Sequence, residues 1–273
     1  MRAGKACALL LAASLAAGVS GCSAGPAGPA GPASSAGPAG SAGSTSASGT
    51  ITVFAAASLK GTFTQLAQRF EAENPGTKVA LSFAGSSDLV TQITQGAPAD
   101  VLATADTSTM ARLADAGLLD GSATTFATNV LEIAVAPANP ASIKSFNDLA
   151  RPGLRVVACA HQVPCGAAAE AVEKTAGTSL RPVSEESSVT DVLGKVVSGE
   201  ADAGLVYRTD VRSAGAKVQG VPFPEASRAV NSYPIATVAS SRAKTLAAAF
   251  ITLVTGSEGK KTLTDAGFGT PQP

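Results

Sequence analysis

The chain of 273 residues contains no tryptophan, one histidine and two tyrosines, and only 4% of its residues are aromatic. Sites that recognise nucleic-acid bases or sugar rings use aromatic platforms for stacking, and this composition gives no sign of them. Basic and acidic residues balance at 20 each. Such a chain has no basic field for a phosphate backbone, so we expect no nucleic-acid partner.

The single histidine, His161, limits the catalytic chemistry of the chain. A Ser-dependent hydrolase needs a base beside its nucleophile, and no Gly-x-Ser-x-Gly turn surrounds Ser58 or Ser86. Zinc would find one histidine and two cysteines that we expect to be oxidised, which is a poor ligand set. Three aspartates without ligand spacing are better explained as caps and turn contacts: Asp88, Asp100 and Asp106. We therefore predict that the protein is not an enzyme and that it has no cofactor and no cation site.

The first 22 residues have the pattern of a secretory signal that ends at a cysteine. Residues 1–5 are short and basic, residues 6–19 are apolar and rich in small side chains, and Ser20-Gly21-Cys22 follows. The small residues before Cys22 resemble a bacterial lipobox, and an ordinary cleaved signal is the alternative. The apolar stretch is shorter than the ~20 residues that span a bilayer. We expect residues 1–21 to be removed and Cys22 to be lipidated, which anchors an extracytoplasmic protein to the cell membrane.

Residues 23–49 contain only Gly, Pro, Ala, Ser and Thr, and with Cys22 they are predicted to form a tether. Glycine recurs there with the period of a collagen triple helix, but the run is short and interrupted. The large domain that follows gives no sign of trimerisation, so we expect a monomer. Loss of Arg2 and Lys5 with the signal takes 20 basic residues to 18 against 20 acidic, a formal charge of −2.

Cys159 and Cys165 are the only cysteines beyond the export segment. In an oxidising compartment the expected state of such a pair is a disulfide. A redox role is less favoured because the spacing is not C-x-x-C. The bond would close a short loop, so its stabilisation should lie at the low end of ~2–4 kcal/mol.

The rest of the chain, from about Gly49 to Pro273, alternates between strand-like and helix-like patterns. The expected strands cover residues 51–54, 79–83, 101–105, 130–136, 155–160, 203–207 and 234–238. The expected helices run from Leu59 to the stop at Asn74-Pro75-Gly76 and over 87–95, 107–116, 167–175, 189–197, 242–255 and 258–265. Repeated strand–helix units predict an α/β fold with parallel, doubly wound sheets.

This alternation is interrupted and restarts after residue 136, which predicts two lobes. We expect lobe one to comprise residues 50–131 and 234–273, and lobe two residues 132–233. The last two helices then pack back on lobe one, and the chain crosses between the lobes twice, near Leu131 and near Tyr233. Ligands of open α/β sheets lie at the carboxyl ends of strands. Two such lobes therefore form a cleft that closes like a hinge.

Two serines stand where a strand-like run meets a helix-like one. Ser58 ends the run Val53-Phe54-Ala55-Ala56-Ala57, and Ser86 ends the run Leu81-Ser82-Phe83-Ala84-Gly85. Backbone N–H groups at a helix N-terminus are unpaired, and a hydroxyl beside them completes an anion site. A single serine of this kind is far more often a simple N-cap. Two such turns in one chain favour a cage for a small oxyanion.

Six ordered segments give the chain a family resemblance over residues 50–273. They are 51–59 (ITVFAAASL), 82–87 (SFAGSS), 96–101 (GAPADV), 163–166 (VPCG), 204–207 (GLVY) and 233–236 (YPIA). Together they resemble the molybdate-binding proteins of bacterial ABC importers, which have the two-lobed type II periplasmic binding fold. The resemblance implies extracytoplasmic binding of molybdate or tungstate and delivery to an ABC permease.

The resemblance also implies a set of ligand-binding residues. Ser58, Ser86 and Tyr207 would offer hydroxyls, and Cys165 and Val189 would offer backbone N–H groups. The family usually has a small residue such as alanine where Cys165 stands. None of the five is charged, so hydrogen bonds of about 1.5–3 kcal/mol each must offset the cost of burying a dianion. Fixed donors also select by size, which favours molybdate or tungstate over sulfate, and a receptor for sulfate or phosphate is the alternative.

Other cargoes are less favoured by the residues available. Ferric sites usually need clustered tyrosines, and this chain has only Tyr207 and Tyr233. Amino-acid receptors need a charged partner for each end of the ligand, which the candidate set lacks. With no titrating side chain in that set, affinity is expected to stay nearly flat between mildly acidic and mildly basic pH.

Overall fold

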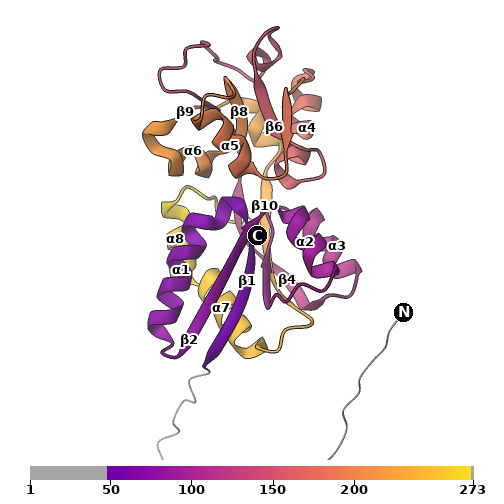
Figure 1. Ribbon diagram of the computed structural model, residues 1–273, viewed down its shortest axis with the longest axis vertical. Coiled ribbons are helices and arrows are strands. Elements are labelled where there is room, and N and C mark those ends of the chain that lie inside the picture. Colours follow the sequence, from indigo (N-terminus) through magenta and orange to yellow (C-terminus); the bar gives the residue numbers. More distant parts are fainter. Residues whose placement is uncertain (1–47, 272–273) are drawn as a thin grey trace, which may run out of the picture. The chain divides into compact units, whose positions relative to one another are not determined.

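The computed structural model describes residues 48–271, whose elements are shown in Figure 1. The expected signal peptide, the lipidation site at Cys22 and nearly all of the tether lie outside the described residues. Within residues 48–271, no helix is both long enough and apolar enough to cross a bilayer.

The first of two five-stranded sheets has the strand order β2-β1-β3-β10-β4. Its strands are β1 (Gly49–Ala56), β2 (Thr77–Ala84), β3 (Val101–Ala103), β4 (Leu119–Asn129) and β10 (Asn231–Val238). β1 runs parallel to β2 and β3, whereas β10 is antiparallel to β3 and β4. We call this sheet with its helices lobe one.

Helices cover both faces of the first sheet. They are α1 (Lys60–Glu73), α2 (Ser86–Thr94), α3 (Thr107–Asp115), α7 (Lys244–Thr255) and α8 (Ser257–Asp265), and a 3-10 turn (Ala57–Leu59) precedes α1. α1, α7 and α8 pack together on one side, and α2 and α3 pack together on the other (Figure 1). The expected return of the last two helices to the first sheet is therefore confirmed.

The second sheet has the order β7-β6-β8-β5-β9 and defines lobe two. Its strands are β5 (Leu131–Val135), β6 (Val156–Cys159), β7 (Ser184–Glu186), β8 (Ala203–Tyr207) and β9 (Gln219–Val221). Its helices are α4 (Pro164–Ala176), α5 (Val189–Val197) and α6 (Arg208–Ala214), with 3-10 turns at Asn147–Ala150, Gly215–Lys217 and Pro224–Arg228. α5 and β8 have the expected bounds.

Two strands that carry the chain between the lobes make both sheets mixed. β10 is antiparallel to its neighbours in lobe one, and β5 is antiparallel to β8 and β9 in lobe two. β1 and β2 end at the side of their sheet that faces lobe two. β10 arrives from lobe two, so it begins at that side and runs in the opposite direction. The expected α/β fold with two lobes and two crossovers is confirmed, but the sheets are not purely parallel as expected.

Four elements were not expected from the sequence: β4, β7, α6 and β9. β4 is the longest of these, and its stretch from Asp120 to Thr125 is exposed. That stretch is small and polar and lacks the alternation of a half-buried strand, because it lies at the edge of the sheet. α4 begins at Pro164 and not at Ala167, since proline is well suited to the first turn of a helix.

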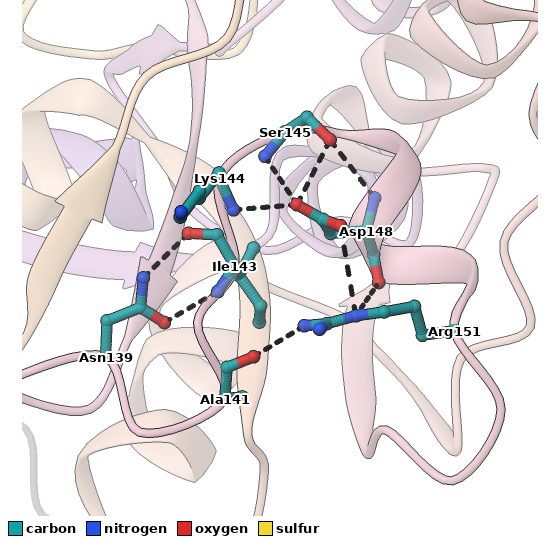
Figure 2. Close-up of polar contacts among 7 residues, drawn as sticks. All are labelled: Asn139, Ala141, Ile143, Lys144, Ser145, Asp148 and Arg151. Atoms are coloured by element: carbon teal, nitrogen blue, oxygen red, sulfur yellow. Dashed lines mark hydrogen bonds and ion pairs between the residues drawn. The ribbon is translucent and has the colours of Figure 1, made fainter.

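Local polar contacts fix the long loop that joins β5 to β6 (Figure 2). The Asn139 side chain accepts a hydrogen bond from the Ile143 N–H at 3.0 Å and donates one to the Ile143 carbonyl at 2.7 Å. Arg151 donates to the carbonyl of Ala141 at 2.7 Å. Asp148 accepts from two backbone N–H groups of the loop, which lowers the pKa of its carboxyl. None of these residues lines the cavity described next.

Candidate functional site

A cavity of about 20 Å³ lies between the two lobes. Lobe one contributes Ala56, Ala57, Ser58, Gly85, Ser86 and Ala105 to its lining. Lobe two contributes Val163, Pro164, Cys165, Ser187, Ser188, Val189 and Tyr207. Pockets for drug-sized organic ligands are usually about 300–1,000 Å³, so this cavity suits a ligand of only a few atoms. The structure brings all five sequence-predicted binding residues together around it.

Ser86 is the first residue of α2 and is buried at 2% exposure. Its Oγ accepts a hydrogen bond from the N–H of Ala105 at 3.0 Å. A backbone N–H can only donate, so the Ser86 hydroxyl keeps its own proton for another acceptor. The first N–H groups of α2 also lack acceptors within the helix. This end of lobe one therefore offers donors to an anion.

Ser58 lies in the 3-10 turn that follows β1, and its side chain is half-buried. Its Oγ is 3.0 Å from the Oη of Tyr233, which is fully buried on β10. Burial raises the pKa of Tyr233, so the phenol keeps its proton at neutral pH. The sequence did not single out Tyr233 as part of the site, because it comes from the second crossover and lies behind the cavity wall.

Two helices of lobe two begin at the cavity. α4 starts with Pro164, which has no N–H, and Cys165 follows as the second residue of its first turn. α5 starts at Val189, after Ser188, whose Oγ accepts from the Asp191 N–H at 3.3 Å. The positive end of each helix dipole therefore faces the cavity together with the free N–H groups of its first turn.

Tyr207 ends β8 and is only 1% exposed. Its hydroxyl is one of two buried side-chain polar atoms, among the described residues, that have no hydrogen-bond partner, although the Tyr233 hydroxyl lies nearby. A buried donor without an acceptor costs about 1–3 kcal/mol. Burial, and to a lesser extent the nearby Tyr233, raises the pKa of Tyr207 well above its ordinary value, so this group is a proton donor. A ligand oxygen in the cavity would satisfy it.

The Asp210 carboxyl lies just behind Tyr207. It is 5% exposed and accepts a hydrogen bond from the Tyr207 N–H at 2.9 Å. Burial raises the pKa of Asp210 to about 7, and the bond from Tyr207 opposes that rise. The sequence did not identify Asp210 as a site residue, because an aspartate three residues after Tyr207 indicates only the first turn of a short helix.

The sulfur atoms of Cys159 and Cys165 are 2.06 Å apart in the structure. Cys165 also lines the cavity. His161 lies in the loop between the two cysteines and is exposed. Across residues 48–271, no group of three or more His, Cys, Asp or Glu side chains is arranged to hold a metal ion.

Direct contacts between the lobes surround the cavity. Ser87 Oγ donates to the carbonyl of Gln162 at 2.7 Å, and the side chain of Asn231, on β10, donates to the Pro164 carbonyl at 3.4 Å. The Cα of Gly85 approaches lobe two so closely that an added Cβ would lie 2.1 Å from the carbonyl oxygen of Ser187. The structure therefore shows the lobes closed upon the cavity.

Two α/β lobes joined by two crossovers and closed over a small cavity of neutral donors are the architecture of a solute-binding protein of the periplasmic type. The family model described as bacterial extracellular solute-binding protein matches residues 51–269. The chain belongs to this bacterial extracellular solute-binding protein family. It is 53% identical over 222 residues to the protein named molybdate-binding protein ModA of Mycobacterium tuberculosis (strain H37Rv), covering 81% of this chain and 85% of that protein.

Solved structures agree with this assignment. The periplasmic molybdate-binding protein of Azotobacter vinelandii matches with a TM-score of 0.72 and 26% identity, covering 81% of this chain and 100% of that chain. The sulfate-binding protein SubI of Mycobacterium tuberculosis matches with a TM-score of 0.69 and 25% identity, covering 82% and 88%. The family consists of binding proteins, so the prediction that this chain is not an enzyme is confirmed.

Proposed function

We propose that this protein binds molybdate in the cavity between its lobes, outside the cytoplasm, and delivers it to an ABC permease. The observation that carries the proposal is the buried hydroxyl of Tyr207, which lines the cavity and lacks an acceptor. The relative named ModA, which shares 53% identity, supports molybdate as the ligand. Tungstate has the same shape and charge, and we include it in the proposal.

The proposed contacts use hydroxyls and backbone N–H groups only. Ser58, Ser86 and Tyr207 would donate through their side chains, and Cys165 and Val189 through the first turns of α4 and α5. Hydrogen bonds to a charged ligand contribute about 1.5–3 kcal/mol each. Five to seven of them, after the costs of closure and ordering, would support a Kd between micromolar and nanomolar, which is about −8 to −12 kcal/mol.

Sulfate is the competing ligand, and the structural likeness to SubI is the observation that favours it. Calorimetric titration of the mature chain, carrying Cys22→Ser to prevent lipidation, would separate the two. We expect tight one-to-one binding of molybdate and tungstate and little response to sulfate or phosphate, because a smaller anion does not reach donors on both lobes together. Equal affinity for sulfate and molybdate would contradict the proposed selectivity.

Replacing Ser58 or Ser86 with alanine should weaken molybdate binding about tenfold to a hundredfold, because each change removes a donor to a buried charge. The same titration measures the loss. His161→Ala is the matched control, since this exposed side chain lies in a loop outside the cavity lining. A Ser58→Ala/Ser86→Ala protein that binds like the unmodified chain would refute the proposed cage.

The remaining features of the exported protein are also proposals. We infer removal of residues 1–21, lipidation of Cys22, a tether that leads to β1, and a monomer whose chain crosses between the lobes near Leu131 and near Tyr233. The distance between Cys159 and Cys165 supports a disulfide in that compartment. The mass of the purified protein should rise by two hydrogens on reduction, and an unchanged mass would mean that the cysteines are free.

A further inference from the structure

Tyr233 lies behind the cavity and is not part of its lining. We propose that Tyr233 is a positioning residue for the anion site, which donates its hydroxyl proton to Ser58 and so turns the Ser58 proton toward the bound anion. This inference rests on the proposed function and adds a residue to the proposed binding machinery.

A serine hydroxyl has a single proton to donate. Ser58 Oγ and Tyr233 Oη are 3.0 Å apart, and either atom is able to donate. If Ser58 donates to Tyr233, its proton is used and its lone pairs face the anion, which is repulsive. If Tyr233 donates to Ser58, the serine proton is free for an anion oxygen. A bound anion therefore selects the second arrangement.

For Ser86, the direction of the corresponding hydrogen bond is fixed. Its Oγ accepts from the backbone N–H of Ala105, a group that has no capacity to accept in return. The Ser86 proton is consequently available to the cavity. In the proposed arrangement each serine accepts one hydrogen bond from the protein and donates its own proton to the ligand, with Tyr233 doing for Ser58 what Ala105 does for Ser86.

The position of the Tyr233 hydroxyl is set by the packing of its ring. The ring centroid lies 5.4 Å from that of Phe268, 6.0 Å from that of Tyr207 and 6.3 Å from that of Phe126. The side chain has 0% exposure, so water does not compete for its proton. Burial also raises the pKa of this phenol, which keeps it protonated and able to donate.

Tyr233→Phe tests the proposal because it removes the hydroxyl and keeps the ring contacts. We expect a loss of about tenfold in molybdate affinity, measured by titration of the mature chain carrying Cys22→Ser, since one charge-assisted hydrogen bond loses its orientation. Thermal unfolding of the ligand-free variant, measured in parallel, would show whether the change also affects the stability of the fold.

A double-mutant cycle separates positioning from a general structural effect. If Tyr233 acts through Ser58, Tyr233→Phe should change affinity less than twofold in the Ser58→Ala background. In the Ser86→Ala background, the matched control, it should still cost about tenfold. The loss therefore disappears only where its target serine is absent.

Two results would overturn the proposal. One is an affinity of Tyr233→Phe equal to that of the unmodified chain, and the other is an equal loss in the Ser58→Ala and Ser86→Ala backgrounds. Both leave the proposed function standing, because the unmodified chain still binds molybdate. Failure of the unmodified chain to bind molybdate would instead overturn the proposed function, and this inference with it.

Discussion

Gly85→Ala is expected to lower molybdate affinity more than a hundredfold while both lobes stay folded. Gly85 caps α2 with φ −57° and ψ 139°, a conformation that alanine adopts without strain. The obstacle is the other lobe, because the added Cβ would lie 2.1 Å from the carbonyl oxygen of Ser187. That oxygen belongs to the backbone just before α5, so it has no flexible side chain that moves aside. The lobes would have to stay further apart.

With the lobes apart, a bound anion would contact the donors of only one lobe. Ser58 and Ser86 belong to lobe one, whereas Tyr207 belongs to lobe two, so a parted cleft does not offer both sets together. Calorimetry measures the affinity, and small-angle scattering measures whether molybdate still makes the protein more compact. The unmodified chain should become more compact on binding, and Gly85→Ala should not.

Gly61→Ala is the matched control for this experiment. Gly61 lies in α1 of the same lobe, and nothing lies within 4 Å of a Cβ added there. Its substitution should leave affinity unchanged and add a little helix stability. An affinity for Gly85→Ala within tenfold of the control would show that binding does not require the lobe contact seen in the structure.

Asp210→Asn should remove a large pH dependence from the stability of the ligand-free protein. The carboxyl of Asp210 has a pKa of about 7 in the folded chain, against an ordinary value of about 3.9 when unfolded. The folded state therefore binds this proton more tightly than the unfolded state does. The stability that the bound proton contributes is lost as pH rises through about 7. Between pH 5 and pH 8 the loss amounts to about 3 kcal/mol in the free energy of unfolding.

Asparagine keeps an oxygen that accepts the Tyr207 N–H and carries no charge, so the variant should escape this loss. Urea unfolding of both proteins at pH 5 and pH 8 measures the difference. Glu132 and Glu173 also have raised pKa values because of burial, but they are common to both proteins and cancel in the comparison. Parallel pH profiles for the two proteins would contradict the assignment of this dependence to Asp210.

The sequence predicted the strongly periodic elements best. α5 and β8 have the expected bounds, because an apolar helix face and a fully buried strand leave clear patterns. β4 was missed because its exposed edge carries small polar residues without alternation. β5 and β10 are antiparallel to their neighbours because of the side from which the chain enters each sheet. Local hydrophobic periodicity does not indicate the direction of a strand within its sheet.

The candidate site was predicted in part for a similar reason. Ser58 and Ser86 stand in turns that are visible in the sequence, and the family resemblance supplied the other three candidates. Gly85 and Tyr233 acquire their importance only through contacts with distant residues, the carbonyl of Ser187 in the opposite lobe and the hydroxyl of Ser58. Asp210 contacts the nearby Tyr207, but its raised pKa comes from burial, which depends on the tertiary packing. Sequence spacing does not reveal such contacts, so their proposed roles had to come from the structure.

The neutral lining of the cavity has a consequence for the charge of the whole molecule. No lysine, arginine, histidine or carboxylate lines it, so a bound molybdate dianion is not neutralised by the residues that hold it. The loaded receptor would therefore carry two more negative charges than the empty one. Its isoelectric point should fall and its migration toward the anode should quicken, so native electrophoresis would distinguish the two forms without any label.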